Sequence, residues 1–178
     1  DSPEAKALIA DLVTHHVAIT STLPVFEGSL PNRPPLNPRA MEVLTVEARE
    51  AYMIARKRAA AQLPQSVEKR TKVFVRGQAM ELAFVRAGGL LIAGCDPTGN
   101  GGVIPGFGDH REIELLVEAG FTPSEAIRIA TLNGAVYLGR ERTIGSVEVA
   151  KNADLLVVRG DPSTNIRDIE NVELVFKD

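Results

Sequence analysis

The chain has 178 residues, a length typical of one domain or of part of a larger one. Apolar residues make up 44% of it, enough for a buried core, and 20 basic against 23 acidic residues lack the basic excess of a general nucleic-acid-binding protein. One cysteine excludes an intrachain disulfide and a cysteine-based zinc site, and no apolar run is long enough to span a bilayer. We therefore expect a soluble, folded domain that has neither nucleic acid nor membrane as a partner.

The N-terminal half is predicted to be mostly helical, with one short strand. Helical spacing of apolar residues indicates helices at three places: residues 3–14, 39–62 and 66–87. Between the first two lie an apolar, partly β-branched stretch at 17–20, which predicts a buried strand, and a loop rich in proline at 28–38. Pro64 separates the second helix from the third, because proline breaks a helix interior.

A second strand is predicted at residues 90–94, a continuous apolar run of the kind found in buried parallel strands. It leads into the stretch Cys95-Asp96-Pro97 and a glycine-rich loop at 98–108. Two capping boxes then predict the starts of two helices: Asp109 with Glu112, and Thr122 with Glu125. We expect the second of these helices to run to about Leu138.

The C-terminal tail differs in character and predicts a separate small sheet. Residues 144–160 and 172–177 are rich in Val, Leu and Ile, with turn-forming residues between them. The order of elements predicts an α/β fold with parallel strands and a β-rich appendage. We place the boundary between residues 1–142 and 143–178.

Asp96 is the strongest candidate for a functional residue. It follows the predicted strand at 90–94, and in parallel α/β folds the carboxyl ends of strands open into the active site. A carboxylate at that position can bind a metal or act as a general base. The alternative is that Asp96-Pro97 only begins a turn, which is a common use of this dipeptide.

The glycine-rich loop at 98–108 does not have the spacing of a nucleotide-binding motif. A dinucleotide fingerprint that begins at Gly99 needs a glycine where Ile104 stands. A P-loop that begins at Gly94 needs lysine where Asn100 stands. We therefore interpret the segment as a loop at an active site or on the surface.

The histidines and the cysteine do not form a complete metal site. His15 and His16 are adjacent, so they point in different directions, and a place near a helix C-terminus accounts for them. His110 opens a helix after the loop that follows Asp96, and it either contacts a substrate or is an exposed first-turn residue. By strand alternation Cys95 faces away from Asp96 and is expected to pack as a small apolar residue.

Several spaced stretches resemble the C-terminal part of the amidohydrolase superfamily: residues 92–96, 112–127, 130–139 and 144–155. The likeness is to the imidazolonepropionase-like and Xaa-Pro dipeptidase-like branch, whose seventh-strand region is similar to Ser21-Thr22-Leu23-Pro24. The resemblance covers most of the chain, and the motifs occur in the order of the family.

The resemblance implies part of a metal-dependent hydrolase of carbon–nitrogen bonds. The fold would be the C-terminal portion of a TIM (β/α)8 barrel, about strands seven and eight with their helices, plus strands of a small composite β-sandwich. Asp96 would be both metal ligand and catalytic proton acceptor for the attacking water, and His110 and Asn100 would contact a small-molecule or dipeptide-like substrate. The expected cofactor is a divalent metal, zinc for preference, as one or two ions.

The chain departs from the family in two small ways and one large one. Cys95 replaces the usual threonine before the aspartate, and Ala150 replaces a usual glycine. The first-strand His-x-His, the bridging ligand and the mid-barrel histidines have no counterpart, so we expect the N-terminal half of the barrel upstream and no activity from this chain alone.

The assembly could be a homo-oligomer. The alternative is a non-catalytic fragment, or an α/β module that binds a ligand or partner; the compartment, cytoplasm or periplasm, stays open.

Overall fold

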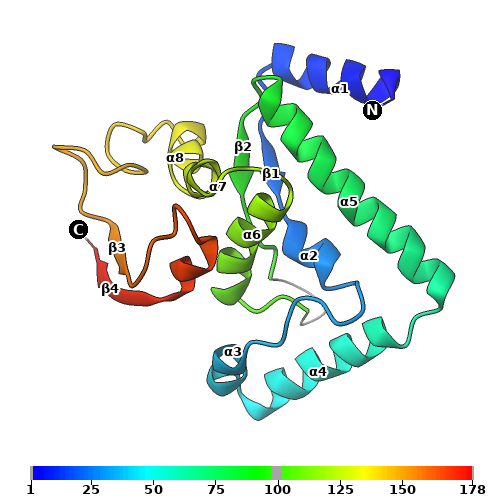
Figure 1. Cartoon of the computed structure of the whole chain (residues 1–178). Helices are drawn as coiled ribbons and strands as arrows, with labels where there is room; N and C mark the ends of the chain where they lie inside the picture. The colour runs from blue at the N-terminus through cyan, green and yellow to red at the C-terminus, as the bar shows by residue number, and fades with distance from the viewer. Residues whose placement is uncertain (1, 98–101, 178) are drawn as a thin grey trace.

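The computed structural model describes residues 2–97 and 102–177, and its elements are shown in Figure 1. The helices are α1 (Pro3–Thr14), α2 (Leu23–Glu27), α3 (Pro38–Val43), α4 (Val46–Ala60), α5 (Pro64–Arg86), α6 (Phe107–Glu118), α7 (Pro123–Ala130), α8 (Leu132–Tyr137) and the 3₁₀ helix η1 (Ile166–Glu170). The strands are β1 (Ile19–Ser21), β2 (Leu91–Ala93), β3 (Leu155–Val158) and β4 (Val172–Phe176). No helix in the described part of the chain has the length and apolar character needed to cross a membrane.

The strands form two separate sheets of opposite type. β1 and β2 pair in parallel, with Ile19 opposite Leu91 and Ser21 opposite Ala93. β3 and β4 pair antiparallel on the other side of α6, as Figure 1 shows. The predicted α/β fold with a parallel pair and a separate β-rich tail is therefore confirmed, although the strand predicted within 144–160 is limited to β3.

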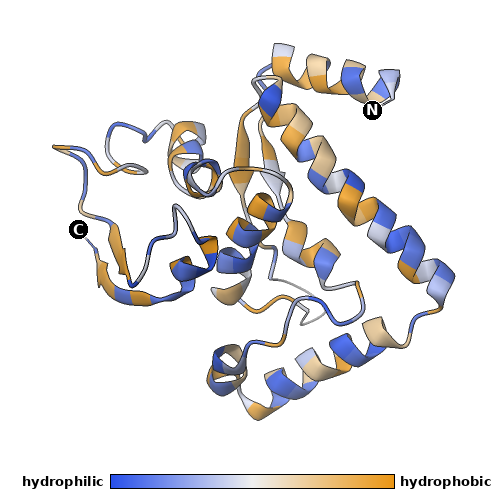
Figure 2. Ribbon diagram, viewed as in Figure 1, coloured by the Kyte–Doolittle hydropathy of each residue, from blue (hydrophilic) through white to orange (hydrophobic). Residues whose placement is uncertain are grey.

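The core lies where α5 and α6 meet β2. Fully buried apolar side chains come from each of these elements: Phe84 of α5, Leu91 of β2, and Leu115 and Leu116 of α6. Figure 2 shows hydrophobic residues on β2, whereas hydrophobic and hydrophilic residues alternate along α4. Gly89 is required beside this core, because a Cβ at that position would lie 2.3 Å from the ring of Phe84.

Two predicted helices are each divided in the structure. The helix predicted at 39–62 is interrupted at Leu44, whose ψ of 141° is extended, and Thr45 then caps α4 by accepting from the Ala48 N–H at 3.2 Å. The helix predicted from Thr122 to Leu138 is interrupted at Thr131, with φ −128° and ψ −81°. Local apolar spacing alone did not show either interruption.

The predicted helix starts at Pro3 and after Thr122 are confirmed, and those at Asp109 and at residue 66 are wrong. Thr122 and Glu125 form the expected capping box. The N-cap of α6 is Gly106 and not Asp109; the Asp109 carboxylate instead accepts from the Gly106 N–H at 3.1 Å, which places it at the third helical position. The helix predicted at 66–87 starts earlier, at Pro64, because proline fits the first turn of a helix.

Candidate active site

Asp96 lies just beyond the carboxyl end of the parallel pair. Ser21 and Ala93 end β1 and β2 at the same level, and two further residues lead from Ala93 to Asp96. Asp96 is exposed and has a φ of +45°, a left-handed conformation that aspartate tolerates better than most residues. The fold therefore presents this carboxylate to solvent at the strand ends, where parallel α/β proteins build their sites.

Gly94 allows the two strand ends to lie close together. A Cβ at Gly94 would lie 3.0 Å from Cγ2 of Thr20 and 3.3 Å from the carbonyl oxygen of Ser21. A larger residue would push the segment that carries Asp96 away from the end of β1. The glycine thus helps to fix where the Asp96 backbone emerges.

Cys95 is buried and is a poor candidate for a nucleophile. Burial, together with the neighbouring Asp109 carboxylate, raises the pKa of the Cys95 thiol to about 12, so it stays protonated at neutral pH. The start of α6 packs on it, since a Cβ at Gly108 would lie 3.2 Å from the Cβ of Cys95. The prediction that Cys95 packs as a small apolar residue is confirmed.

The other predicted site residues are placed in different ways. His110 is half-buried on the first turn of α6, and Asn100 lies outside the described residues. His15 lies at the C-terminus of α1, where its Nδ1 is 2.9 Å from the carbonyl oxygen of Asp11, as expected for a helix end. Within residues 2–97 and 102–177 no three His, Cys, Asp or Glu side chains form a group that could hold a metal.

The Asp96 carboxylate still fits as one ligand of a divalent metal. Carboxylate oxygens bind Zn²⁺, and they bind harder cations as well. Its exposure at the strand end leaves it accessible to an ion. Among the described residues, Asp96 could thus supply one donor of the three or four that a catalytic zinc site needs.

Two buried carboxyl groups, which we call the acid pair (Glu81 of α5 and Glu112 of α6), lie beside the end of β1. The Ser21 hydroxyl donates to Oε2 of Glu81 at 2.9 Å, and the Leu23 N–H donates to Oε2 of Glu112 at 3.0 Å. Oε1 of Glu112 is buried and has no hydrogen-bond partner among residues 2–97 and 102–177. Burial raises the pKa of Glu81 to about 7 and, with the added charge of Glu81, that of Glu112 to about 8. Local spacing did not indicate this pair, because Glu112 stands three residues after Asp109, as in a capping box.

A second group of charges, which we call the arginine cluster (Arg111, Glu27, Glu114, Glu118 and Arg33), joins α2 to α6. Arg111, Glu27 and Glu114 are buried, whereas Arg33 and Glu118 lie at the edge of the cluster. Arg111 donates from Nε to Oε2 of Glu27 at 3.0 Å and from Nη2 to Oε1 of Glu27 at 2.8 Å. It also binds Glu118 at 2.6 Å and forms an ion pair with Glu114. Burial would lower the pKa of Arg111, but the hydrogen bonds and charge of Glu27 raise it instead.

The arginine cluster also fixes the segment that follows α2. Arg33 donates to Glu27 at 2.8 Å and to Glu118 at 2.7 Å, so one fully buried carboxylate accepts from two guanidinium groups. The spacing of Arg111, Glu114 and Glu118 along one helix was visible in the sequence. Their partner Glu27 lies 84 residues from Arg111 in the chain, and no local pattern indicated that contact.

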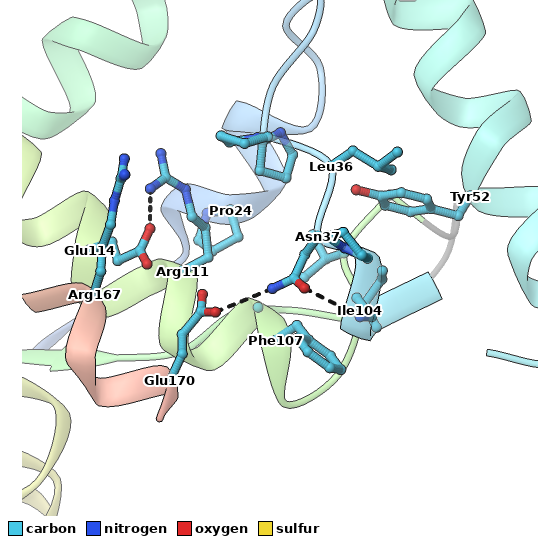
Figure 3. Close-up of a pocket in the computed structure, with 17 residues that line it drawn as sticks. Pro24, Leu36, Asn37, Tyr52, Ile104, Phe107, Arg111, Glu114, Arg167 and Glu170 are labelled. Atoms are coloured by element: carbon cyan, nitrogen blue, oxygen red, sulfur yellow. Dashed lines mark hydrogen bonds and ion pairs between the residues drawn. The ribbon is translucent and has the colours of Figure 1, made fainter. Parts of the chain in front are cut away.

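A cavity of about 370 Å³ lies next to the arginine cluster (Figure 3). Its walls come from the segments that follow β1 and β2, which are residues 34–38 and 102–104, together with α6 and η1. Figure 3 shows Tyr52 and Phe107 toward one end and Arg111, Glu114 and Arg167 toward the other. Neither Asp96 nor His110 is among the described residues that line it.

Comparison with known proteins gives one family match. The model of the amidohydrolase family matches residues 85–178. A 5′-deoxyadenosine deaminase of Methanobrevibacter smithii is 42% identical over 48 residues, which cover 27% of this chain and 11% of that protein. An imidazolonepropionase of Symbiobacterium thermophilum is 33% identical over 84 residues, which cover 44% of this chain and 20% of that protein.

A solved structure has the same fold over nearly the whole chain. The crystal structure of a prolidase complexed with N-methylphosphonate-L-proline superposes with a TM-score of 0.60 at 20% sequence identity. The superposition covers 96% of this chain but 36% of that one. The chain thus spans well under half the length of each of these proteins.

Proposed function

The chain belongs to the amidohydrolase family, whose model matches residues 85–178 of its 178, and from this we propose that the intact protein is a metal-dependent hydrolase of a carbon–nitrogen bond. Membership confirms the resemblance inferred from the sequence motifs. The observation that carries the proposal is the place of Asp96, an exposed carboxylate just beyond the end of a parallel strand. The substrate we propose is a small molecule or dipeptide-like compound with an amide or cyclic amide bond.

The proposed architecture is about strands seven and eight of a TIM barrel, formed by β1 and β2 with their helices. β3 and β4 would belong to the composite sandwich, with the domain boundary between residues 142 and 143. Two parallel strands cannot close a barrel, and each strand of this pair leaves an edge that further strands could cover. The superposition on 36% of a prolidase chain supports the same assignment.

In this proposal Asp96 has two tasks. Its carboxylate would hold the divalent metal, zinc for preference, with the remaining ligands supplied by residues outside this chain. A bound metal would lower the pKa of a water molecule that it binds and would polarise the substrate carbonyl. The Asp96 carboxylate accepts the proton of the attacking water and returns it to the leaving nitrogen, which is ordinary general acid–base catalysis. We propose His110 and Asn100 as substrate contacts.

The test is Asp96→Asn in the intact protein. Loss of the proton acceptor should lower turnover of an amide substrate by about 10²–10⁴-fold, with an unchanged circular dichroism spectrum. Asp11→Asn is the matched control, since Asp11 is an exposed aspartate on α1 and the chemical change is the same. Full turnover by the Asp96 variant would refute the assignment.

The second candidate is a non-catalytic module that binds a ligand. The 370 Å³ cavity favours it, because that cavity is formed without Asp96. The two candidates differ in what the intact protein does with an amide substrate and added zinc. Hydrolysis that requires Asp96 supports the enzyme, and binding without hydrolysis supports the module.

A further inference from the structure

The cavity beside the arginine cluster has the properties of a preformed small-molecule site. Its volume of about 370 Å³ lies within the range of about 300–1,000 Å³ found for such sites. Pro24, Pro34, Pro35 and Pro38 contribute to its wall, and proline has a fixed φ. A wall built this way loses little conformational freedom when a ligand enters, which favours binding.

The aromatic end of the cavity suits an apolar body. Tyr52 is buried, with its ring inside the wall and its hydroxyl accepting from Nη1 of Arg56 at 3.4 Å. Phe107 and Ile104 face the same space from the segment that follows β2. Aromatic rings at such a wall bury a large apolar area and favour stacked or edge-on contacts with a ligand ring.

The charged end of the cavity includes Arg167, whose positive charge lies near Glu114 and acts to lower the pKa of that carboxyl. Arg111 and Glu114 pair with each other, and Glu170 accepts from Nδ2 of Asn37 at 3.3 Å. Arg39 donates to the carbonyl oxygen of Glu170 at 3.2 Å and so places a positive charge near that glutamate. Arg167, by contrast, makes no hydrogen bond or ion pair within the described part of the chain, although it lines the cavity.

We propose that this cavity binds a small carboxylate with an apolar or aromatic body. The carboxylate would accept from the Arg167 guanidinium, a geometry that arginine favours. The body would lie against Tyr52 and Phe107. This site is separate from the one built around Asp96, and its walls include the end of the loop that begins at Asp96.

The test is isothermal titration of the intact protein with 3-phenylpropionate and with the neutral 3-phenylpropanamide. We expect saturable binding of the acid with a Kd of about 1 mM or tighter, and at least about tenfold weaker binding of the amide. Arg167→Gln should weaken binding of the acid by about tenfold, because a charged hydrogen bond is lost. Arg159→Gln is the matched control: this arginine pairs with Glu173 outside the cavity, and its loss should leave the Kd unchanged.

Two more variants keep the proposal open to refutation. Ile104→Trp fills the cavity from a loop position and should abolish binding, while Asp96→Asn should leave the Kd unchanged and so separates this site from the proposed catalytic one. No saturable binding of the acid, equal binding of acid and amide, or an unchanged Kd in Arg167→Gln would each overturn the proposal.

Discussion

The acid pair and the arginine cluster share one helix, and they solve the burial of carboxyl groups in opposite ways. Glu112 and Glu114 are two residues apart on α6, and both are nearly inaccessible to solvent. Glu114 faces the Arg111 guanidinium, which partly offsets the rise in its pKa caused by burial. Glu112 has no cation to pair with among the described residues and faces Glu81 instead, so burial and the charge of Glu81 together raise its pKa to about 8. At similar depth, the group that lies across from a buried glutamate therefore either offsets the rise in pKa that burial causes, as Arg111 does for Glu114, or adds to it, as Glu81 does for Glu112.

Removal of the Arg111 cation is expected to have the largest effect on stability. Arg111→Met would leave Glu27 fully buried, with Arg33 as its remaining charged partner. We expect a loss of about 3–5 kcal/mol in the free energy of unfolding, measured by urea denaturation of the intact protein. Arg86→Met removes an exposed arginine that pairs with Glu125, and the urea midpoint should then stay unchanged. Equal midpoints for the two variants would show that the arginine cluster does not stabilise the fold.

A smaller loss of stability is expected when the acid pair loses a hydrogen-bond donor. Ser21→Ala removes the hydroxyl that donates to Glu81, with little change in volume. The buried Oε2 then loses its donor, and we expect a loss of about 1–3 kcal/mol in the free energy of unfolding. The loss should grow as the pH rises above 7, since the hydroxyl stabilises the ionised form of Glu81. A loss that does not change with pH would contradict the assigned proton on Glu81.

Glu112→Gln is expected to cause the smallest change in the free energy of unfolding at neutral pH. Its pH dependence tests the contrast between the acid pair and the arginine cluster most sharply. The amide keeps the acceptor for Leu23 N–H and never ionises. In the wild type, Glu112 has a pKa raised from 4.5 to about 8, so the folded chain binds more protons than the unfolded chain between those values. Its stabilising effect is complete below about pH 4.5 and is lost as the pH rises toward 8.

The measurement is the free energy of unfolding of wild type and Glu112→Gln from about pH 5 to pH 8. The variant should show a shallower fall with pH and become the more stable of the two near pH 8. Parallel curves would mean that Glu112 is ionised throughout this range and that the acid pair holds no proton. The Glu114→Gln variant serves as control, because Arg111 then loses a partner and stability falls at every pH in the range.

Local signals in the sequence predicted the parts of the fold that depend on near neighbours. The apolar run at 90–94 predicted β2, and Thr122 with Glu125 predicted the start of α7. The carboxylate of Asp96 was found because its place after a strand is itself a local pattern. Interruptions at Leu44 and Thr131 were missed, since apolar spacing continues across both.

Contacts between distant residues could not be predicted from the same signals. Glu112 satisfies the spacing of a capping box with Asp109, yet it accepts from Leu23, 89 residues away in the chain. The local choice was ambiguous because Asp109 also fits as the third residue of a box that begins at Gly106. In the folded chain α6 packs on the end of β1, and the helix start at Gly106 is the one that forms rather than the start at Asp109.

The most direct test of the central claim, that Asp96 serves a metal-dependent hydrolase, is the metal content of intact wild-type protein and Asp96→Asn, measured side by side by native mass spectrometry. The account predicts one or two divalent ions per wild-type subunit and loss of at least part of that metal in the variant. A wild type that hydrolyses its substrate without bound metal, or a variant with full metal content and full turnover, would contradict it.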